Sequence, residues 1–256
     1  MNERSNEISR RRLLGFAAAG TSGLLLGGCD RLNGSEGFRS VLEDTENLTM
    51  RSQRFLMGDR LAREFGESDI SPVFKANGSL GVTDPVYRGH FTQQFAAWAL
   101  HVDGLVRQPL TLPLTALKGF PQRTQITRHD CVEGWSAIGK WQGPQLSAVL
   151  AQAGLLPEAR YAVFHCADVL AGSPYYESID LIDAFHPQTI LAWQMNDQPL
   201  TEQHGAPIRL RVERQLGYKQ AKYIMRIELR STLAGLYKGK GGLWEDRSDY
   251  AWYAGI

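Results

Sequence analysis

The sequence predicts an α+β fold that is rich in β-strands. Short, β-prone apolar segments recur along residues 98–229, and turn dipeptides such as Asp103-Gly104 and Asn196-Asp197 separate them. Residues 146–153 are the one clear short helix in this stretch, and Gly154 follows them as a helix stop. Many short strands with few helices are typical of the α+β class.

The composition is that of a globular protein with balanced charge. The chain has 256 residues and is 43% hydrophobic, which is enough for a full core in one or two domains. It has 28 basic and 27 acidic residues, so no basic field suggests a nucleic-acid partner. It has no cysteine–histidine spacing of a zinc site and no CxxCH motif for covalent haem. We therefore expect no nucleic-acid partner and no fused haem.

Residues 1–29 have the features of a targeting segment. The sequence Ser9-Arg10-Arg11-Arg12-Leu13-Leu14 contains a twin arginine, and the apolar run over residues 13–28 is shorter than the ~20 residues that span a bilayer. This pattern resembles a Tat signal, which exports folded proteins. We expect export to the periplasm, and Tat substrates often carry a cofactor that is inserted before export.

The end of this run resembles a bacterial lipobox. It reads Leu26-Gly27-Gly28-Cys29, and Asp30 follows, which resembles a signal for retention in the inner membrane. We expect Cys29 to carry a lipid anchor. A soluble periplasmic protein cleaved near Gly28 and a bare transmembrane anchor remain as alternatives.

Residues 30–70 are expected to form a linker and an amphipathic helix, and residues 71–256 the catalytic domain. Apolar residues at helical spacing, Leu56, Leu61 and Phe65, support a helix within residues 40–67. The dipeptides Ser71-Pro72, Asn77-Gly78 and Asp84-Pro85 predict the end of this helix and two turns.

From residue 98 onward the pattern indicates strands. Residues 99–106 alternate and turn at Asp103-Gly104, which predicts a hairpin. Residues 110–117 are interrupted by Pro113, which predicts an edge strand that runs into a turn or a helix start. Further strands are expected at residues 124–127, 161–166, 190–195, 208–212 and 223–229.

Cys131 lies in a polar stretch just before Gly134 and Trp135. This is an unusual setting for a structural cysteine, which is normally a small buried hydrophobe. A thiolate can be a nucleophile, half of a disulfide or a ligand to a soft metal. From the cysteine pattern alone, a metal site and a disulfide with Cys166 are equally open, because an oxidising compartment favours disulfides.

Three blocks, in order, resemble the sulfite oxidase family of molybdopterin-dependent oxidoreductases. The first is CVEGWS at residues 131–136 with WQG at 141–143, and the second is LAW at 191–193 with HGAPIRL at 204–210. The third is GYKQAKYI at residues 217–224. The resemblance covers about residues 98–229 and implies a sulfite-oxidase-type molybdopterin-binding fold with a Mo-molybdopterin cofactor.

The resemblance also implies roles for individual residues. Cys131 would bind molybdenum as a thiolate and Tyr175 would place a phenol near the metal. Arg128 would supply positive charge, either to an anionic substrate or to the cofactor. The expected contacts to the pterin and its phosphate are Asn77, Cys166, His204, Arg209, Gln220, Ala221 and Lys222.

The chain departs from the bacterial methionine-sulfoxide-reducing members of this family. It has His204 where they have Asn, Leu80-Gly81 where they have a Tyr-Glu pair, and Cys166 where they have Thr. The resemblance therefore implies oxygen-atom transfer but leaves the substrate open between sulfite oxidation and sulfoxide or N-oxide reduction.

The organisation of the chain sets expectations for its partners. It ends at Ile256 without the C-terminal dimerisation domain of animal and plant sulfite oxidases, so we expect a monomer with one catalytic domain. Electrons would be exchanged with a separate c-type cytochrome or membrane haem protein. The alternative is an exported lipoprotein that uses the same fold as a binding or scaffold module without turnover.

Overall fold

The computed structural model describes residues 35–256. The expected twin-arginine segment and lipobox lie outside the described residues. The described residues belong to two units that divide after Leu56, and each is treated by itself. Within the described part of the chain, no helix is both long and apolar enough to cross a membrane.

The described part of the first unit is the helix α2, Glu36–Met57, whose last residue begins the second unit. The sequence predicted a helix within residues 40–67, so the helix exists but ends ten residues earlier than expected. Gly58 follows it with a φ of +52°, a left-handed conformation that commonly terminates helices. Phe65 lies in extended chain instead, where its backbone N–H donates to the carbonyl of Ile126 at 2.9 Å.

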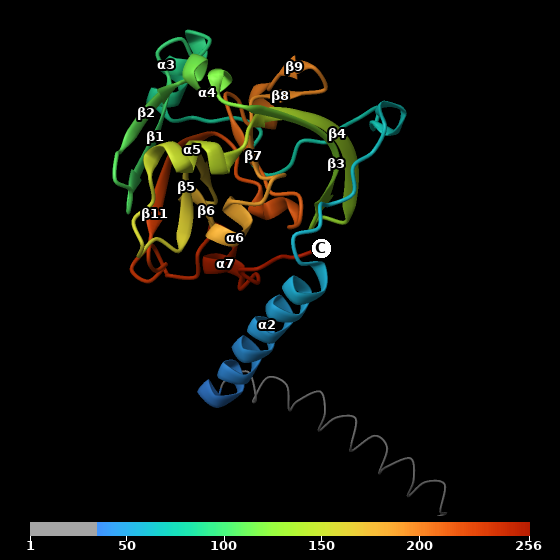
Figure 1. The fold of residues 1–256 in the computed structure, drawn as a ribbon, viewed down its shortest axis with the longest axis vertical. Helices are drawn as coiled ribbons and strands as arrows, with labels where there is room; N and C mark the ends of the chain where they lie inside the picture. The colour runs from blue at the N-terminus through green and yellow to red at the C-terminus, as the bar shows by residue number, and fades with distance from the viewer. Residues whose placement is uncertain (1–34) are drawn as a thin grey trace, which may run out of the picture. The chain divides into compact units, whose positions relative to one another are not determined.

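The second unit is built on a five-stranded mixed sheet with the order β2-β1-β11-β5-β6 (Figure 1). Its strands are β1 (Ala99–Gly104), β2 (Leu110–Pro113), β5 (Tyr161–Leu170), β6 (Ser173–Asp180) and β11 (Ile224–Arg230). β1 and β11 are parallel, and the other neighbours are antiparallel. The edge position of Pro113 is confirmed. The expected hairpin exists, but Asp103 and Gly104 belong to β1 and pair with β11, so the turn lies later, at residues 105–109.

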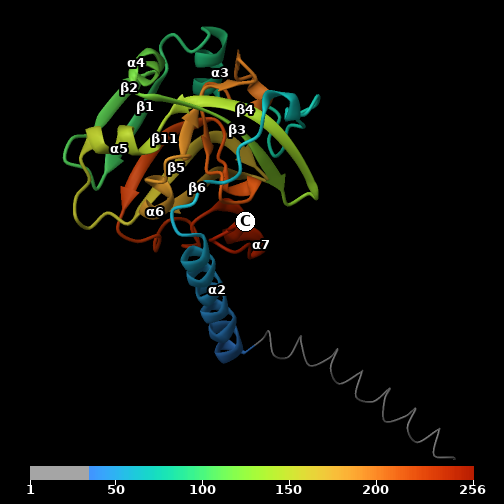
Figure 2. The same ribbon diagram turned by 45° about the vertical axis from the view of Figure 1, so that its right-hand side comes forward.

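A second sheet contains the strand that carries Cys131. β3 (Gln122–Cys131) and β4 (Trp135–Pro144) pair along their whole length and form a long curved ribbon (Figures 1 and 2). β8 (Gln194–Met195) and β9 (Gln198–Pro199) continue this sheet. The strand expected over residues 190–195 is divided, because β7 (Ile190–Ala192) pairs with β10 (Arg209–Arg211) instead.

Short helices fill the connections. α5 (Leu146–Ala153) ends at Gly154, whose φ is +66°, and it packs its apolar side into the core beneath the five-stranded sheet. Asp84-Pro85 starts the helix α3 rather than forming an isolated turn, because the Asp84 side chain accepts from the backbone N–H of Tyr87. The remaining helices are α3 (Pro85–Thr92), α4 (Leu114–Gly119), α6 (Leu181–Ala184), α7 (Leu243–Ser248), η1 (Glu67–Asp69), η2 (Glu202–His204) and η3 (Gly217–Lys219).

Gly143 marks the place where β4 crosses β7. A Cβ at this position would lie 2.1 Å from the carbonyl oxygen of Leu191, which is closer than any real contact. The backbone N–H of Trp193 donates to the carbonyl of Gln142 at 3.0 Å in the same place. The glycine of the WQG block is therefore required by a backbone-to-backbone contact.

Candidate functional site

Cys131 is the last residue of β3 and lies at the tip of the β3–β4 ribbon. It pairs with Trp135, and the turn between them is closed by a hydrogen bond from the N–H of Gly134 to the carbonyl of Cys131 at 3.0 Å. Gly134 has a φ of +84°, which explains the glycine in the CVEGWS block. Partial burial raises the pKa of the Cys131 thiol, so a metal that bound here would displace its proton.

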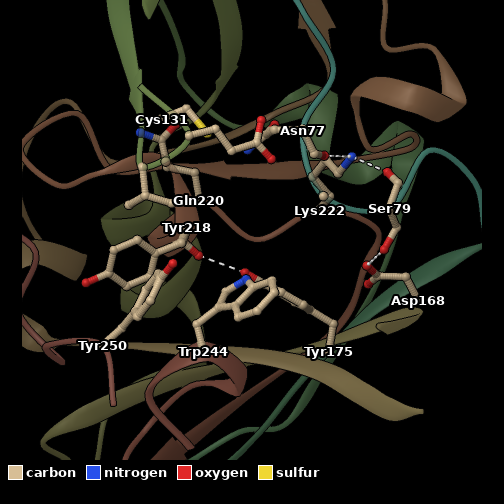
Figure 3. Close-up of a pocket in the computed structure, with 14 residues that line it drawn as sticks. Asn77, Ser79, Cys131, Asp168, Tyr175, Tyr218, Gln220, Lys222, Trp244 and Tyr250 are labelled. Carbon is tan, nitrogen blue, oxygen red and sulfur yellow. Dashed lines mark hydrogen bonds between the residues drawn. The ribbon is translucent and has the colours of Figure 1, made fainter. Parts of the chain in front are cut away.

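A cavity of about 190 Å³ opens beside this thiol (Figure 3). Five of the residues expected at the site line it, although they come from distant parts of the sequence: Asn77, Cys131, Tyr175, Gln220 and Lys222. Cys166 is also a free thiol, so the structure shows no disulfide between the two cysteines. The fold thus brings the first and third sequence blocks to one cavity, whereas no residue of the second block lines it.

Tyr175 lies on β6 with its side chain in the cavity wall. Its hydroxyl donates to the carbonyl of Tyr218 at 2.7 Å. Burial raises the pKa of Tyr175 well above its ordinary value, so the phenol stays protonated at neutral pH. Its oxygen lone pairs remain available to accept a hydrogen bond from a ligand.

Lys222 holds the loop that covers the cavity. Its Nζ donates to the carbonyls of Asn77 at 2.7 Å, Ser79 at 2.5 Å and Gln203 at 2.9 Å. An ammonium has three donors, so a phosphate could bind Lys222 only by displacing one of these carbonyls. Burial, assisted by the charge of Arg209, lowers the pKa of Lys222 to about 7.

Arg209 is a buried cation without an ion-pair partner among the described residues. Its Nη1 donates to the carbonyl of His204 at 3.2 Å and its Nη2 to that of Gln220 at 3.4 Å, while Nε has no partner. Burial and the neighbouring charge of Arg211 lower its pKa to about 9. A buried guanidinium is costly without an anion. Its unpaired donor therefore fits the phosphate of a pterin cofactor.

Four of the expected cofactor contacts, Arg209 among them, lie outside the cavity lining. His204 has both ring nitrogens engaged, Nε2 with the carbonyl of Phe74 at 3.1 Å and Nδ1 with the hydroxyl of Thr201 at 2.8 Å. Cys166 packs against the main core, where burial raises the pKa of its thiol well above the ordinary value. Ala221 is buried in the same core and its carbonyl accepts from the N–H of Leu210 at 2.8 Å.

Arg128 is placed differently from the expectation. β3 continues to Cys131, so Arg128 lies an odd number of residues from Cys131 and faces the opposite side of the strand. Its side chain is 56% exposed and pairs with Asp130 at 3.0 Å. Arg128 therefore does not share the cavity with Cys131.

Several cavity residues were not predicted from the sequence. Asp168 on β5 is buried, its Oδ2 accepts from the hydroxyl of Ser79 at 2.5 Å, and its Oδ1 has no partner. Burial raises its pKa, so the carboxyl favours its protonated form. No local signal in the sequence marks Asp168, because β5 has a register irregularity between His165 and Val169 and regular alternation does not apply there.

An aromatic wall closes one side of the cavity. Tyr218, Trp244 and Tyr250 gather there, and Figure 3 shows them apart from Asn77, Lys222 and Asp168. The Tyr218 and Tyr250 rings lie 5.0 Å apart edge to face, and those of Trp244 and Tyr250 lie 5.9 Å apart and stacked. Trp244 and Tyr250 belong to an aromatic, glycine-rich segment with no recognised motif.

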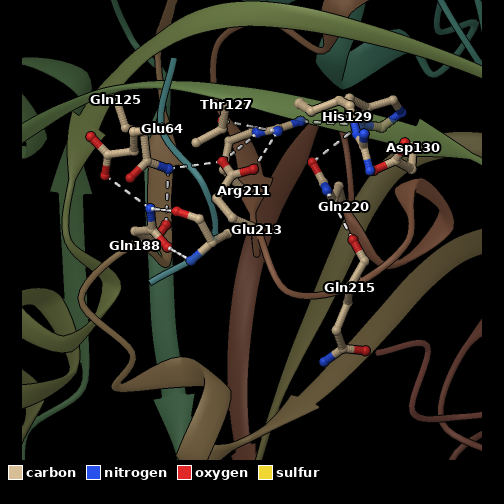
Figure 4. Close-up of polar contacts among 12 residues, drawn as sticks. Glu64, Gln125, Thr127, His129, Asp130, Gln188, Arg211, Glu213, Gln215 and Gln220 are labelled. Carbon is tan, nitrogen blue, oxygen red and sulfur yellow. Dashed lines mark hydrogen bonds and ion pairs between the residues drawn. The ribbon is translucent and has the colours of Figure 1, made fainter. Parts of the chain in front are cut away.

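A buried polar network lies behind the Cys131 strand (Figure 4). The side chains of Gln125, Thr127 and His129 alternate inward along β3. Gln125 donates to Glu213 at 2.8 Å, and Glu213 forms a fully buried ion pair with Arg211 at 2.5 Å. This network holds in place the buried face of β3, the face on which Cys131 also lies.

A second, larger cavity of about 690 Å³ lies between α3 and α4. Its walls are mostly apolar and include Phe91, Phe95 and Trp193. None of the expected site residues lines it.

Comparison with known proteins gives one family and two similar enzyme subunits. Residues 88–235 match the family described as the oxidoreductase molybdopterin-binding domain. The chain is 39% identical over 197 residues to YedZ1 of Azospira oryzae, which is named as a protein-methionine-sulfoxide reductase subunit, and the match covers 77% of this chain and 69% of YedZ1. It is 32% identical over 173 residues to MsrP of Campylobacter jejuni, named as a protein-methionine-sulfoxide reductase catalytic subunit, with 62% of this chain and 56% of MsrP covered.

Among solved structures, the chain is similar to the sulfane dehydrogenase SoxCD of Paracoccus pantotrophus. The TM-score is 0.51 and the sequence identity 22%, with 60% of this chain and 41% of that chain covered. At this identity the similarity shows a shared fold.

Proposed function

Because the chain belongs to the oxidoreductase molybdopterin-binding domain family, which includes the sulfite oxidases, we propose that this molybdenum-dependent oxidoreductase reduces sulfoxides. The proposed substrate class is the methionine sulfoxide side chain of oxidised proteins. Reduction of one sulfoxide consumes two electrons and two protons and yields a thioether and one water molecule.

The character of the cavity wall carries this proposal. The wall beside Cys131 is aromatic, through Tyr218, Trp244 and Tyr250, and includes the acidic residue Glu133, whereas the Asp168 carboxyl favours its protonated form and adds no negative charge. Its one cation, Lys222, already donates to three carbonyls. Such a wall disfavours a sulfite dianion, whereas a neutral sulfoxide and its thioether product make favourable sulfur–aromatic contacts.

The residues present suit a molybdopterin cofactor. We propose that Cys131 binds the metal as a thiolate and that Arg209 binds the phosphate of the pterin. Asn77 and Gln220, which line the cavity, would hydrogen-bond the pterin ring. When bound, the cofactor supplies a molybdenum centre that accepts an oxygen atom with a two-electron change.

Two side chains of the protein can supply the protons. Tyr175 and Asp168 both line the cavity, and burial raises the pKa of each. A protonated carboxyl can hydrogen-bond a sulfoxide oxygen and then release a proton to it, whereas the Tyr175 phenol must first leave the carbonyl of Tyr218, to which its hydroxyl donates. The Oδ1 atom of Asp168, which has no partner, is the freer of the two groups.

The proposed electron donor is a separate haem protein, either a c-type cytochrome or a membrane haem protein. Two relatives are named as subunits, which supports a redox partner on another chain. The Tat-like segment and the lipobox at Cys29 support a periplasmic enzyme with a lipid anchor in the inner membrane. Arg10→Lys with Arg11→Lys should leave the precursor in the cytoplasm, whereas Cys29→Ser should release exported protein from the membrane fraction.

Metal analysis and turnover test the function together. Native protein made with molybdopterin synthesis intact should contain about one Mo per chain and should reduce methionine sulfoxide residues with reduced viologen as electron donor. Cys131→Ser should lose both the Mo and the sulfoxide reductase activity. Cys29→Ser is the matched cysteine control and should keep both the Mo and the activity. Protein that contains Mo and oxidises sulfite but reduces no sulfoxide would contradict the proposed substrate. Mo without turnover on any oxygen donor or acceptor would favour the alternative, a binding or scaffold module of the same fold.

A further inference from the structure

Three charged side chains meet in the dry interior behind the aromatic wall. Nζ of Lys219 lies 2.5 Å from Oε1 of Glu177 and 2.6 Å from Oε1 of Glu245. All three side chains are essentially without solvent exposure. Glu177 comes from β6, Lys219 from η3 and Glu245 from α7, so the cluster joins three elements that are distant in the sequence.

Each member of this triad is adjacent to a residue of the cavity wall. Lys219 follows Tyr218, and Glu245 follows Trp244. Glu177 lies two residues after Tyr175 on β6. The hydroxyl of Tyr175 also donates to the carbonyl of Tyr218. The cavity wall and the triad are therefore connected both along the chain and through this hydrogen bond.

The triad holds one cation and two carboxyl groups. Oε2 of Glu177 and Oε2 of Glu245 have no hydrogen-bond partner. Two carboxylates that share one ammonium in a dry site cannot both stay ionised without a large cost, so the pair retains a proton. Burial, with the charge of Glu245, raises the pKa of Glu177 well above its ordinary value.

Among the described residues, Lys219 is the one cation in contact with the two carboxyls of the triad, since Nζ of Lys238 reaches only the backbone carbonyl of Asp246. On β6, Tyr176 donates to Asp246, an acidic neighbour of Glu245 on α7. Cys166 of β5 and Tyr175 of β6 face Glu177 as protonated groups. These neighbours are neutral or negative, so they do not balance the net negative charge of two carboxylates and one ammonium. A proton shared by the two carboxyls removes that charge.

The backbone beside the triad leaves room for the two carboxyls. A Cβ on Gly242 would lie 2.1 Å from Oε2 of Glu245 and 2.7 Å from Oε1 of Glu177. The entry to α7 therefore requires glycine at residue 242, because any side chain would displace the carboxyls from Lys219.

We propose that Glu177, Lys219 and Glu245 act as one positioning unit, with one proton shared between the carboxyls, that holds Tyr175 and the Tyr218 and Trp244 side chains of the aromatic wall in place for the sulfoxide substrate. This inference rests on the proposed function for its substrate. The triad touches neither the substrate nor the cofactor, so its effect reaches the substrate through Tyr218 and Trp244.

Kinetics of the Mo-loaded enzyme test the positioning. Glu245→Ala removes the link to α7 and should raise KM for a methionine sulfoxide peptide by about tenfold, with kcat within about twofold of wild type. Glu245→Gln keeps the hydrogen bond to Lys219 and should restore KM to near the wild-type value. Asp249→Asn, an exposed change just after the same helix, is the control and should have no effect. A KM for Glu245→Ala equal to that of wild type overturns the inference.

Two spectroscopic measurements separate failure of this inference from failure of the proposed function. In protein labelled with 5-fluorotryptophan, the Trp244 resonance is assigned by its loss in Trp244→Phe. It should broaden in Glu245→Ala and stay sharp in Glu245→Gln, even if no sulfoxide is a substrate. An unchanged resonance in Glu245→Ala overturns the inference.

Infrared difference spectra test the shared proton. Wild-type protein at pH 7 should show, for the triad, the carbonyl stretch of a protonated, buried carboxylic acid that shifts in D₂O and that is distinguished from the band of the protonated Asp168 by its persistence in Asp168→Asn. This band should be lost in both Glu245→Gln and Glu177→Gln, because one carboxylate and one ammonium then form a neutral pair. The two glutamine variants keep the size of the side chains and should fold even if Glu245→Ala does not. A wild-type spectrum without this band, or a band that persists in both variants, shows that no proton is shared.

Discussion

Nη1 of Arg211 lies 3.1 Å from Nδ1 of His129, and neither side chain is exposed to solvent. A guanidinium can only donate, so Nδ1 of His129 accepts and the ring proton resides on Nε2. Burial and the charge of Arg211 hold the pKa of His129 well below its ordinary value, which keeps the ring neutral. His129 lies two residues before Cys131 on the same face of β3, so Arg211 orients the strand that ends in the proposed metal ligand.

The stability contribution of Arg211 can be measured. Arg211→Met leaves Glu213 as a buried carboxylate without its ion pair, which should lower the free energy of unfolding by about 3–5 kcal/mol. Arg226→Met is the matched control, because its pair with Asp103 is partly exposed and should contribute only about 0–1 kcal/mol. Denaturant midpoints of the two variants give both values. Equal losses would show that burial of the Arg211 pair has no special effect.

Molybdenum content distinguishes the two arginines that were expected near the cofactor. Arg209→Met should reduce cofactor affinity by at least about tenfold, since charge-assisted hydrogen bonds contribute ~1.5–3 kcal/mol. Arg128→Ala should leave the Mo content unchanged, because Arg128 faces the other side of β3. Mo per chain, measured after purification and dialysis, checks both. Loss of Mo in Arg128→Ala but not in Arg209→Met would reverse this assignment.

Lys222 should make the stability of the cofactor-free protein depend on pH. Its pKa is lowered to about 7 in the folded protein, against ~10.4 in an unfolded chain. Between these values the unfolded chain binds a proton that the folded protein lacks, so the free energy of unfolding should rise with pH by up to about 1.4 kcal/mol per unit. Below pH 7 this contribution levels off, because both states are protonated.

The Lys222→Met variant isolates that effect. Urea unfolding of both proteins at several values between pH 7 and 10 should show wild type gaining stability relative to the variant as pH rises. A difference that stays constant across this range would mean that Lys222 keeps an ordinary pKa in the fold.

Gly143 provides a test of the crossing between β4 and β7. Gly143→Ala would place a Cβ 2.1 Å from the carbonyl oxygen of Leu191, so the strands must separate. We expect a loss of about 1–3 kcal/mol or more, as for overpacked cores. Gly119→Ala is the control, because a Cβ there meets no atom within 4 Å. Its thermal midpoint should equal that of wild type, and the same result for Gly143→Ala would refute the close approach.

The local sequence predicted individual strands and helices of this fold better than it predicted which strands pair. Alternation and turn residues predicted the β1–β2 hairpin, the edge strand at Pro113 and the helix before Gly154. The parallel pairing of β1 with β11 joins segments more than 100 residues apart. The local sequence pattern carries no information about which strands pair, because strand pairing depends on how the faces of the sheet pack against the rest of the protein.

The candidate site shows the same division. Cys131, Gln220 and Lys222, which the motif blocks predicted for the site, line one cavity, and their roles there stay predictions. The strand was expected to stop at residue 127, but β3 runs to Cys131, so Arg128 faces the other side of the strand, and its role stays a prediction. Asp168 and Trp244 were missed because neither lies in a motif, and only tertiary packing brings them to the cavity.

The position of β11 constrains the order of events during biosynthesis. It is the middle strand of the five-stranded sheet, yet it is the last strand of that sheet to leave the ribosome. β1 and β5 cannot find their shared neighbour until about nine-tenths of the chain has been made, and such long-range pairing forms slowly. Gln220 and Lys222 directly precede β11, so the cavity is completed in the same late step. Cofactor loading must therefore follow completion of synthesis, and a nascent chain threaded across a membrane while still unfinished would reach the far side without a binding site.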